Sequence, residues 1–398
     1  PAPANAAPLS WDQAVVLARQ NNPDLKSAAL SVESAESSYK GTFSDYFPQI
    51  SASGGYTKSR SGGVTSNDHS YSLSAQQSIF SGFRTWASQS HARTQKDVAG
   101  ADFSLTASQT LFDLRSAFVN LLYTQENLAL LEKIRARRED NLRLIELRYQ
   151  AGRENRGSLL RSRAQLSQAK FEVDSAKREL RTVQKRLSSI INAPDFEVNT
   201  VTGSFQTASK DSAPDFESLI LRTPSYQKAA RQLKLSQSAV VTARSDFFPS
   251  ISVSGSGRRR GDEFPPETDS WSVGASASYA IFSGNRTHYN VQQSKLERSR
   301  ASQNLVSVRR SLEVSLEDAF LKLQDAAGQA QVQSEFLDAA QERASIARAQ
   351  YTNGLVTFQD WDIIEGDLIS AQKQNLSALR ASALSEANWQ LSIGAGFQ

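Results

Sequence analysis

The sequence predicts an α+β protein in which β-hairpins alternate with very long helices, and three observations lead to this prediction. The chain contains an internal duplication, because landmarks of its first half recur about 200 residues later. A hydrophobic period of two marks a hairpin in each copy. A proline-free run of about 68 residues with helical spacing follows each hairpin. A repeat of this length is too long for a solenoid module, so we expect two similar halves packed into one body.

The duplication rests on four landmarks that occur in the same order in both copies. They are Asn22-Pro23 and Thr223-Pro224, Phe47-Pro48 and Phe248-Pro249, Ile79–Gly82 and Ile281–Gly284, and Tyr149–Gly152 and Tyr351–Gly354. We therefore expect a first structural repeat at 1–192, an inter-repeat linker at 193–213 and a second repeat at 214–398. The two repeats should interleave rather than form separate domains.

The composition is that of an ordinary folded protein. Apolar residues make up 39% of the 398 residues, charged residues make up 22%, and the net charge is +4, which gives no strong nucleic-acid signal. Cysteine is absent and the histidines are scattered, which excludes disulfides, a cysteine nucleophile and a zinc site. We expect no metal and no cofactor.

The beginning of the chain indicates export. The whole chain contains no methionine, and it starts with Pro1-Ala2-Pro3-Ala4, which is typical of a mature end after signal-peptide removal, although an engineered boundary would look the same. The absence of an N-terminal cysteine argues against a lipid anchor. No stretch approaches 18 consecutive apolar residues, so any membrane span would have to be a β-barrel.

Taken in order, each copy begins with helical spacing and then changes to a period of two. Residues 9–44 are predicted to be helical, and hairpins are predicted at about 46–80 and 247–282, where apolar residues alternate with serines. Strands of about ten residues can cross a bilayer when tilted, although a soluble antiparallel sheet would alternate in the same way. Aromatic residues near the strand ends favour the bilayer, as interfacial girdles: Tyr46, Phe47, Tyr56, Tyr71, Phe80, Phe248, Trp271 and Phe282.

Long helices follow the hairpins, at about 82–150 and 284–352. Each would be a rod about 100 Å long. Gly152 and Gly354 are helix stop signals, after which return helices are expected at about 158–192 and 357–392.

Four strands cannot close a membrane barrel, since the smallest such barrels need about eight. Closure therefore requires several chains, and three copies would give twelve strands around a lumen. The serine faces would line water and the apolar faces would contact lipid.

The duplicated motifs resemble those of the TolC family of outer-membrane channel proteins, which serve efflux pumps and type I secretion. The match is carried by the Phe-Pro before each hairpin, the Ile-Phe-Ser-Gly after it, and the tip segments Arg148–Gly152 and Gln350–Val356, and it covers nearly the whole chain. The resemblance implies a homotrimer with a 12-stranded outer-membrane β-barrel. A long periplasmic α-helical barrel with a mixed α/β equatorial region would continue it.

In the resembled family, inward coiling of the second helical hairpin closes the tunnel, and acidic residues ring the axis there. Asp360 matches the first ring aspartate, whereas the second ring position is Ile363 here. Asp362, Glu365 and Asp367 are nearby acids that would substitute for it. Three Asp360 carboxylates on one axis would attract cations. The alternative is that these acids only solvate the hairpin.

Tyr351 matches a tyrosine that ties the closed hairpins together in the family. Its usual aspartate partner is Ser158 here, and the arginine of a second tie is Val356. The resemblance therefore implies a weakened latch, or one built from Arg153, Glu154 and Arg156.

The resemblance also assigns the docking of a periplasmic adaptor protein to the two tips. Gly354-Leu355-Val356 fits the family's Gly-Leu-Val type of sequence, whereas Gly152-Arg153 begins a far more polar tip and favours a more charged adaptor. Both glycines also read as helix C-caps, and that role alone is the alternative.

The implied function is an exit duct gated at its periplasmic tip, in the bacterial outer membrane and extending into the periplasm. Its partners would be outer-membrane lipid, the adaptor and an inner-membrane RND or ABC pump. It would passively conduct small toxic compounds or secreted proteins. We expect no enzyme, because paired carboxylates lie on continuous helices with no histidine or glycine loop nearby. The alternative is a soluble or peripheral coiled-coil scaffold whose hairpins are dimerisation sheets.

Overall fold

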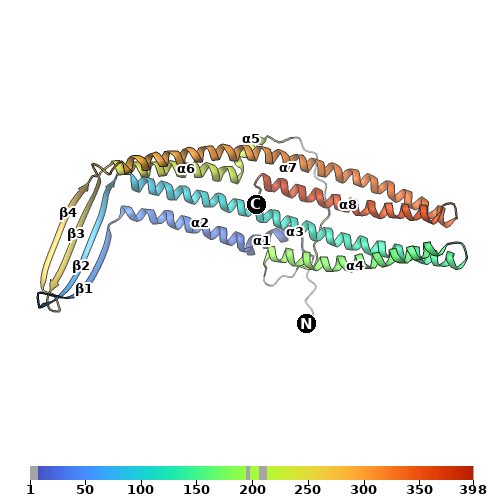
Figure 1. Ribbon diagram of the computed structural model, residues 1–398, viewed down its shortest axis with the longest axis horizontal. Coiled ribbons are helices and arrows are strands. Elements are labelled where there is room, and N and C mark those ends of the chain that lie inside the picture. Colours follow the sequence, from blue (N-terminus) through green and yellow to red (C-terminus); the bar gives the residue numbers. More distant parts are fainter. Residues whose placement is uncertain (1–7, 194–197, 206–212, 398) are drawn as a thin grey trace. The chain divides into compact units, whose positions relative to one another are not determined.

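The computed structural model describes residues 8–193, 198–205 and 213–397 of the chain. The secondary-structure elements alternate as the duplication predicts, with two helices, two strands and two long helices in each half (Figure 1). In chain order they are α1 (Trp11–Asn21), α2 (Pro23–Gly41), β1 (Gln49–Ser61), β2 (Val64–Ser81), α3 (Arg84–Gln150), α4 (Arg156–Ile191), α5 (Phe216–Arg222), α6 (Pro224–Arg244), β3 (Ser250–Gly261), β4 (Thr268–Ser278), α7 (Arg286–Thr352) and α8 (Phe358–Ser392).

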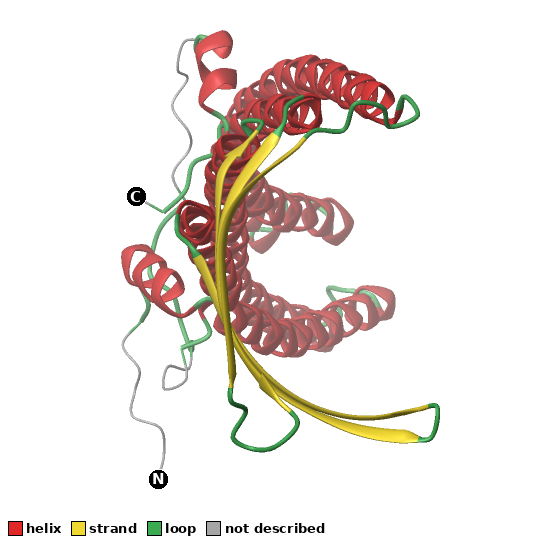
Figure 2. Ribbon diagram, turned by 90° about the vertical axis from the view of Figure 1, so that its left-hand side faces the viewer, coloured by secondary structure: helices red, strands yellow, loops and turns green. Residues whose placement is uncertain are grey.

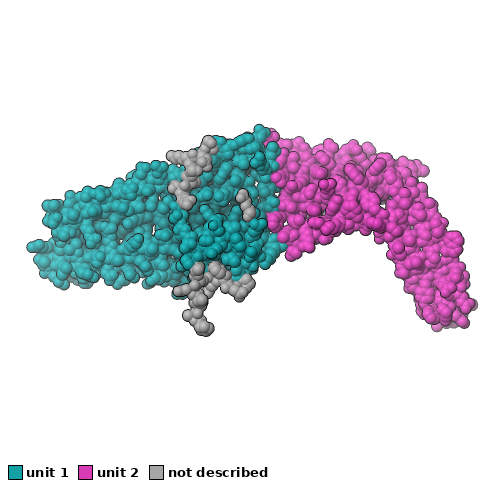
Figure 3. Space-filling view, turned by 180° about the vertical axis from the view of Figure 1, so that it is seen from behind, with its two compact units in different colours: residues 1–27, 104–224, 311–398 teal, residues 28–103, 225–310 magenta. Residues whose placement is uncertain are grey.

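The chain groups into two compact units, and each draws on both halves of the sequence (Figure 3). Unit 1 contains residues 1–27, 104–224 and 311–398, and unit 2 contains residues 28–103 and 225–310. The long helices α3 and α7 contribute to both. Within the described ranges, no helix combines the length and the apolar character that a membrane span requires.

Unit 2 carries a single antiparallel sheet in the order β1-β2-β3-β4 (Figure 2). Serine hydroxyls of neighbouring strands face each other across it, and the contacts include Ser53 with Ser72 at 2.7 Å and Ser256 with Ser272 at 3.0 Å. Because side chains alternate between the faces of a strand, the apolar residues between these serines share the opposite face. The predicted serine face and apolar face are therefore both present in the sheet.

The strands have 13, 18, 12 and 11 residues, so they exceed the expected length of about ten. The second hairpin ends earlier than expected, at Ser278, which pairs with Ser250. The preceding residue on the partner strand, Pro249, has no N–H to continue the ladder.

The change from strand β2 to helix α3 requires a glycine at position 82. Gly82 and Phe83 both have positive φ, at 64° and 69°, so the helix begins only at Arg84. A Cβ on Gly82 would lie 2.4 Å from the carbonyl oxygen of Ser245. Arg84 donates to the hydroxyl of Ser245 at 3.1 Å and forms an ion pair with Asp246, which fixes the turn against the end of α6.

Unit 1 has its main hydrophobic core where α1, α3 and α4 meet Val198 and Val201 of the inter-repeat linker. Leu9 forms a parallel β-bridge with Val201, and its amide donates to the carbonyl of Thr200 at 2.9 Å. Buried side chains around this bridge include Leu114, Phe118, Leu121, Leu187 and Ile191. This arrangement is the mixed α/β region that the resemblance implied. Part of the predicted linker, at 194–197 and 206–212, lies outside the described residues.

Candidate functional site at the helix tips

Each pair of long helices in unit 1 ends in a short tip whose backbone is closed by a glycine. Gly152 and Gly354 have φ values of 70° and 76°, the left-handed conformation that favours glycine. The following amides reach back into the helix, from Arg153 to the carbonyl of Arg148 at 2.8 Å and from Leu355 to that of Gln350 at 2.9 Å. Both glycines are therefore helix C-caps, as the sequence suggested.

The two apolar residues of the Gly354-Leu355-Val356 segment lie in different environments. Leu355 is exposed, whereas Val356 is half-buried and packs on the cluster formed by Ile145, Leu159, Ala347, Tyr351 and Trp361. At the first tip, Gly152 and Arg153 are exposed. Of the residues expected to dock an adaptor, Leu355 is thus the one apolar side chain that faces outward, whereas Val356 helps to hold the tip together.

Aromatic side chains join α7 to α8 just behind the second tip. Tyr351 and Trp361 are both buried, and their rings stack with centroids 4.5 Å apart. Arg148, from α3, places its guanidinium 4.3 Å above the Tyr351 ring and donates to the carbonyls of Tyr351 and Thr352 at 2.8 Å. An arginine of the first tip therefore caps the end of helix α7.

The Tyr351 hydroxyl donates to the Glu154 carboxylate at 2.8 Å. Burial and the nearby Glu154 carboxylate raise the pKa of Tyr351 to about 12. Ser158, which stands where the family has an aspartate, is buried, and its amide donates to the side chain of Asn155 at the start of α4. Of the three residues suggested for an alternative latch, Glu154 is thus the one that contacts Tyr351.

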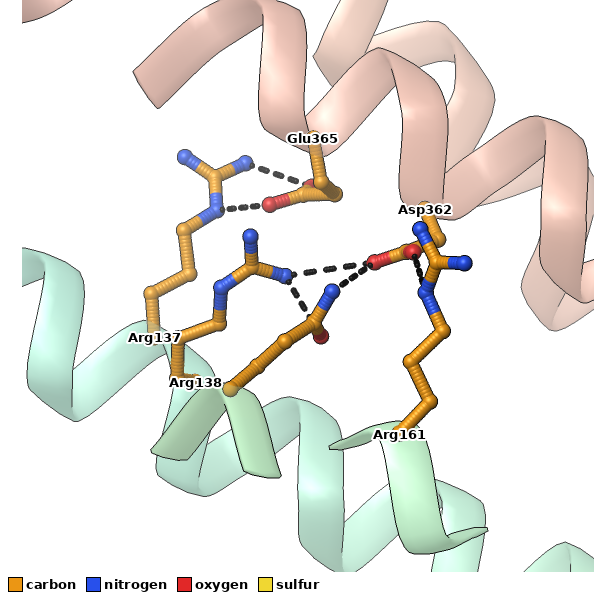
Figure 4. A network of polar contacts seen from close by, with 6 residues as sticks. Arg137, Arg138, Arg161, Asp362 and Glu365 are labelled. Carbon is orange, nitrogen blue, oxygen red and sulfur yellow. Dashed lines mark hydrogen bonds and ion pairs between the residues drawn. The ribbon is translucent and has the colours of Figure 1, made fainter. Parts of the chain in front are cut away.

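A network of charged side chains connects α8 to α3 and α4 about one turn beyond the aromatic cluster (Figure 4). The Asp362 carboxylate lies 2.6 Å from Arg161 Nε, 2.8 Å from Gln165 Nε2 and 3.4 Å from Arg138 Nη1. The Glu365 carboxylate accepts a hydrogen bond from Arg137 Nη2 at 3.0 Å. A second contact, from Arg137 Nε to Glu365 at 2.8 Å, is an ion pair without hydrogen-bond alignment.

The acids expected at the gate therefore differ in their environments. Asp362 and Glu365 are buried, at 5% and 0% exposure, and arginines neutralise both of them. Asp367 is exposed and paired with Arg343 at 3.1 Å. Asp360 is exposed and accepts a hydrogen bond from the Thr357 hydroxyl at 2.6 Å, and Thr357 caps the start of α8 by accepting from the Asp360 amide. Among the described residues, Asp360 is the member of this group without a basic partner.

Sequence reasoning missed the basic half of this network. Arg137, Arg138 and Arg161 lie on long helices where arginine is ordinarily solvated, and their partners are more than 200 residues away in the chain. The available signal was the i, i+3 spacing of Asp362 and Glu365, which places two acids on one face of α8. The described residues contain no group of three or more His, Cys, Asp or Glu side chains that could hold a metal ion.

Comparisons with known proteins agree with this architecture. The sequence model of a family described as outer membrane efflux protein matches residues 14–193 and 216–395. A probable outer membrane lipoprotein, SilC of Salmonella typhimurium, is 24% identical over 400 residues, covering 96% of this chain and 84% of SilC. The cation efflux system protein CusC of Escherichia coli O157:H7 is 23% identical over 395 residues, covering 96% of this chain and 85% of CusC. A crystal structure of CusC superposes with a TM-score of 0.87 at 18% identity, covering 99% of this chain and 96% of that one.

Proposed function

Since the chain belongs to the outer membrane efflux protein family, we propose that three copies form an exit duct that passively conducts exported compounds across the periplasm and the outer membrane. Family membership confirms the resemblance that the sequence motifs indicated and the expected location in the outer membrane. The trimer, the gate and the docking of partners are proposals that rest on the features of the described residues given below.

The observation that carries this proposal is a sheet with two exposed faces and two open edges. β1 and β4 each pair with a neighbour on one side only. Every residue of β1 and β4 is exposed in the single chain, including Trp271 at 82% and Val273 at 73%. Open edges and a large exposed apolar face favour association. Three copies would contribute twelve strands, which closes the edges and turns the apolar face toward lipid.

The apolar face also has the height of a bilayer core. Tyr71 and Phe80 mark the two ends of this face on β2, and because a bulge between Ser78 and Phe80 takes up one residue, their partners Arg259 and Ile251 on β3 are eight positions apart. At about 3.4 Å per residue and a tilt of about 40°, this separation spans roughly 21 Å, close to the apolar band of about 25 Å in outer-membrane barrels. Phe83 and Phe248, whose rings pack edge to face, extend the aromatic group at the Phe80 end. The serine face would then line an aqueous passage.

The gate is proposed to lie where α8 contacts the first helical hairpin. Opening would separate α7 and α8 from α3 and α4, and this requires breaking the Tyr351–Glu154 hydrogen bond and the ion pairs of Asp362 and Glu365. Asp360 faces solvent at the tip, so a trimer would bring three such carboxylates toward one axis. These charges would favour cations at the entrance.

The adaptor is proposed to dock on the exposed tips, with Leu355 as the apolar anchor and Gly152 and Arg153 as the polar side. The two tips differ in charge, because the first carries Arg153 and Arg156 where the second carries Leu355 and Phe358. An inner-membrane pump of either the RND or the ABC type would supply the energy. The relative CusC is named for cation efflux, and the acidic Asp360 tip is compatible with cationic cargo.

A planar-bilayer recording of the purified protein tests the duct directly. The expected result is a trimer in detergent, by native mass spectrometry, that inserts into bilayers and gives stepwise ion conductance. The competing function, a soluble or peripheral coiled-coil scaffold, predicts a protein that stays monodisperse without detergent and gives no conductance. A detergent-free, non-trimeric protein would refute the duct.

A further inference from the structure

The apolar face of the sheet carries a groove with Gly257 at its floor. Its volume is about 700 Å³, and it runs over all four strands, from Ala52 and Gly54 of β1 to Trp271 of β4. On this face Gly257 of β3 lies between Leu73 of β2 and Trp271 of β4. A Cβ on Gly257 would have nothing within 4 Å, so the space above this position is open. The next residue inward on the same face, Gly255, lies between Ala75 and Val273, and a Cβ there would lie 3.8 Å from the Val273 side chain.

The walls of the groove are large and apolar. Trp271 stands on one side, and Leu73 and Tyr71 stand on the other, all of them exposed in the single chain. The Tyr71 ring lies across Gly54 of β1, whose added Cβ would come within 3.3 Å of it. Phe264, from the loop between β3 and β4, packs edge-on against Tyr71 with centroids 6.2 Å apart. The groove is therefore an apolar trough parallel to β3, bordered by aromatic rings at its outer end.

A cation closes the outer end of this trough. Arg259 follows Gly257 on the same face, about 7 Å further along the strand, and pairs with Tyr71 on one side and Asp269 on the other. Its guanidinium donates to Asp269 through Nε at 2.5 Å and Nη2 at 3.2 Å. An arginine has five N–H donors, so further donors remain for an anion. Arg258, one residue earlier, also borders the groove, but its side chain stands on the opposite serine face, because it pairs with Ser72 and Ser270.

We propose that this groove binds an acyl chain of a phosphorylated glycolipid of the outer leaflet, lipid A, with a lipid phosphate on Arg259. The inference rests on the proposed function, since a duct whose helices extend into the periplasm places the hairpin turns at the outer surface. The aromatic rings then lie at the height of the lipid headgroups and the glycine trough lies in the hydrocarbon. Arginine can bind phosphate through two N–H donors at once. The trough can accept an apolar chain because Gly257 has no side chain that would fill it.

The test uses the delipidated trimer in detergent and native mass spectrometry with added lipid A or, separately, phosphatidylglycerol. The trimer is expected to retain lipid A at one molecule per subunit and to bind phosphatidylglycerol more weakly. Gly257→Leu fills the trough and Arg259→Gln removes the cation, and each is expected to weaken lipid A binding about tenfold, the effect of one lost charge-assisted or packing contact. Arg258→Gln removes the same charge from the opposite face and is expected to leave binding unchanged.

Equal losses of lipid A affinity in Arg258→Gln and Arg259→Gln would overturn the site, because general charge attraction would then explain the binding. Equal affinity for phosphatidylglycerol would overturn the assignment to lipid A. A trimer that conducts ions but retains no lipid A would overturn this inference and leave the duct intact. A protein that neither trimerises nor conducts would overturn both. Arg259→Gln keeps the strand geometry, so the test stands even where Gly257→Leu does not fold.

Discussion

Tyr351 shows how one side chain connects the two helical tips through three different contacts. Its ring stacks on Trp361 and lies under Arg148, and its hydroxyl donates to Glu154. The aromatic stack fixes the position of the ring, and this position brings the hydroxyl to Glu154, the acid of the first tip. The resemblance implied a latch at Tyr351, and the contact with Glu154 supports the proposal that this residue replaces the usual partner, whose position is occupied by Ser158.

The first prediction concerns the titration of Tyr351. Its pKa is raised to about 12, first by burial and then by the Glu154 carboxylate. A folded pKa above the unfolded value of about 10 means that the unfolded chain loses this proton first as pH rises. The contribution to stability is therefore complete below pH 10 and is lost between about pH 10 and 12. In a spectrophotometric titration at 295 nm, Tyr351→Phe should remove the tyrosinate that forms last.

Tyr149 provides the matched control, because it occupies the corresponding position of the first repeat but is exposed. Tyr149→Phe removes one tyrosine while the Tyr351 hydroxyl stays in place, so the tyrosinate that forms last should remain in this variant. If Tyr351→Phe also keeps the tyrosinate that forms last, Tyr351 is not held as the structure describes.

At the scale of elements, helix α8 is fixed to the first helical hairpin by charge rather than by apolar packing alone. Glu365 is fully buried and depends on Arg137 for its charge compensation. Removing one partner of a buried pair leaves the other without compensation, which costs about 3 kcal/mol or more. Arg137 keeps partial access to solvent, at 29% exposure, so the lower end of that range applies.

The second prediction is therefore that Glu365→Gln lowers the stability of unit 1 by about 3 kcal/mol, measured by denaturant unfolding of the detergent-solubilised protein. Asp367→Asn is the control on the same helix, since its pair with Arg343 is exposed and such pairs contribute about 0–1 kcal/mol. The same loss in both variants would show that α8 is held by its overall charge and not by the buried pair.

The turns from strand to helix allow a third prediction that uses the duplication itself. Gly82 and Gly284 have nearly the same φ, 64° and 62°, so alanine at either position strains the backbone by a similar amount, about 1 kcal/mol. A Cβ at Gly82 would also meet the Ser245 carbonyl oxygen at 2.4 Å, whereas a Cβ at Gly284 meets nothing within 4 Å. Gly82→Ala should therefore be the more destabilising by about 1–3 kcal/mol in thermal or denaturant unfolding.

The difference between these two variants isolates the steric clash from the backbone strain. Equal stabilities of Gly82→Ala and Gly284→Ala would mean that the α6 end does not pack against the β2 turn as described. Loss of trimer from Gly82→Ala alone, by native mass spectrometry, would agree with the close packing at this turn.

For the whole molecule, the order of the elements and the extent of the long helices could be predicted because their signals are local. The glycines at 82, 152, 284 and 354 end or begin the long helices wherever the rest of the chain lies. The Arg137–Glu365 contact could not be predicted, because its residues are 228 positions apart and meet only through the packing of the helices. The groove over Gly257 was equally hidden, since four strands from both halves of the sequence are needed to build it.

The last prediction joins the residue to the assembly. A trimer would bring three copies of the exposed Asp360 to the tip of the duct, where their combined field attracts cations more strongly than one carboxylate can. Asp360→Asn should therefore lower cation selectivity and weaken block by added divalent cations in single-channel recordings. Asp367→Asn removes the same charge from the same helix at a site already paired with Arg343, so it should change neither quantity. Because both variants alter the net charge equally, a difference between them assigns the effect to the position of Asp360. Unchanged selectivity and block in Asp360→Asn would remove this residue from the gate, while the conductance of the trimer would still stand as evidence for the duct.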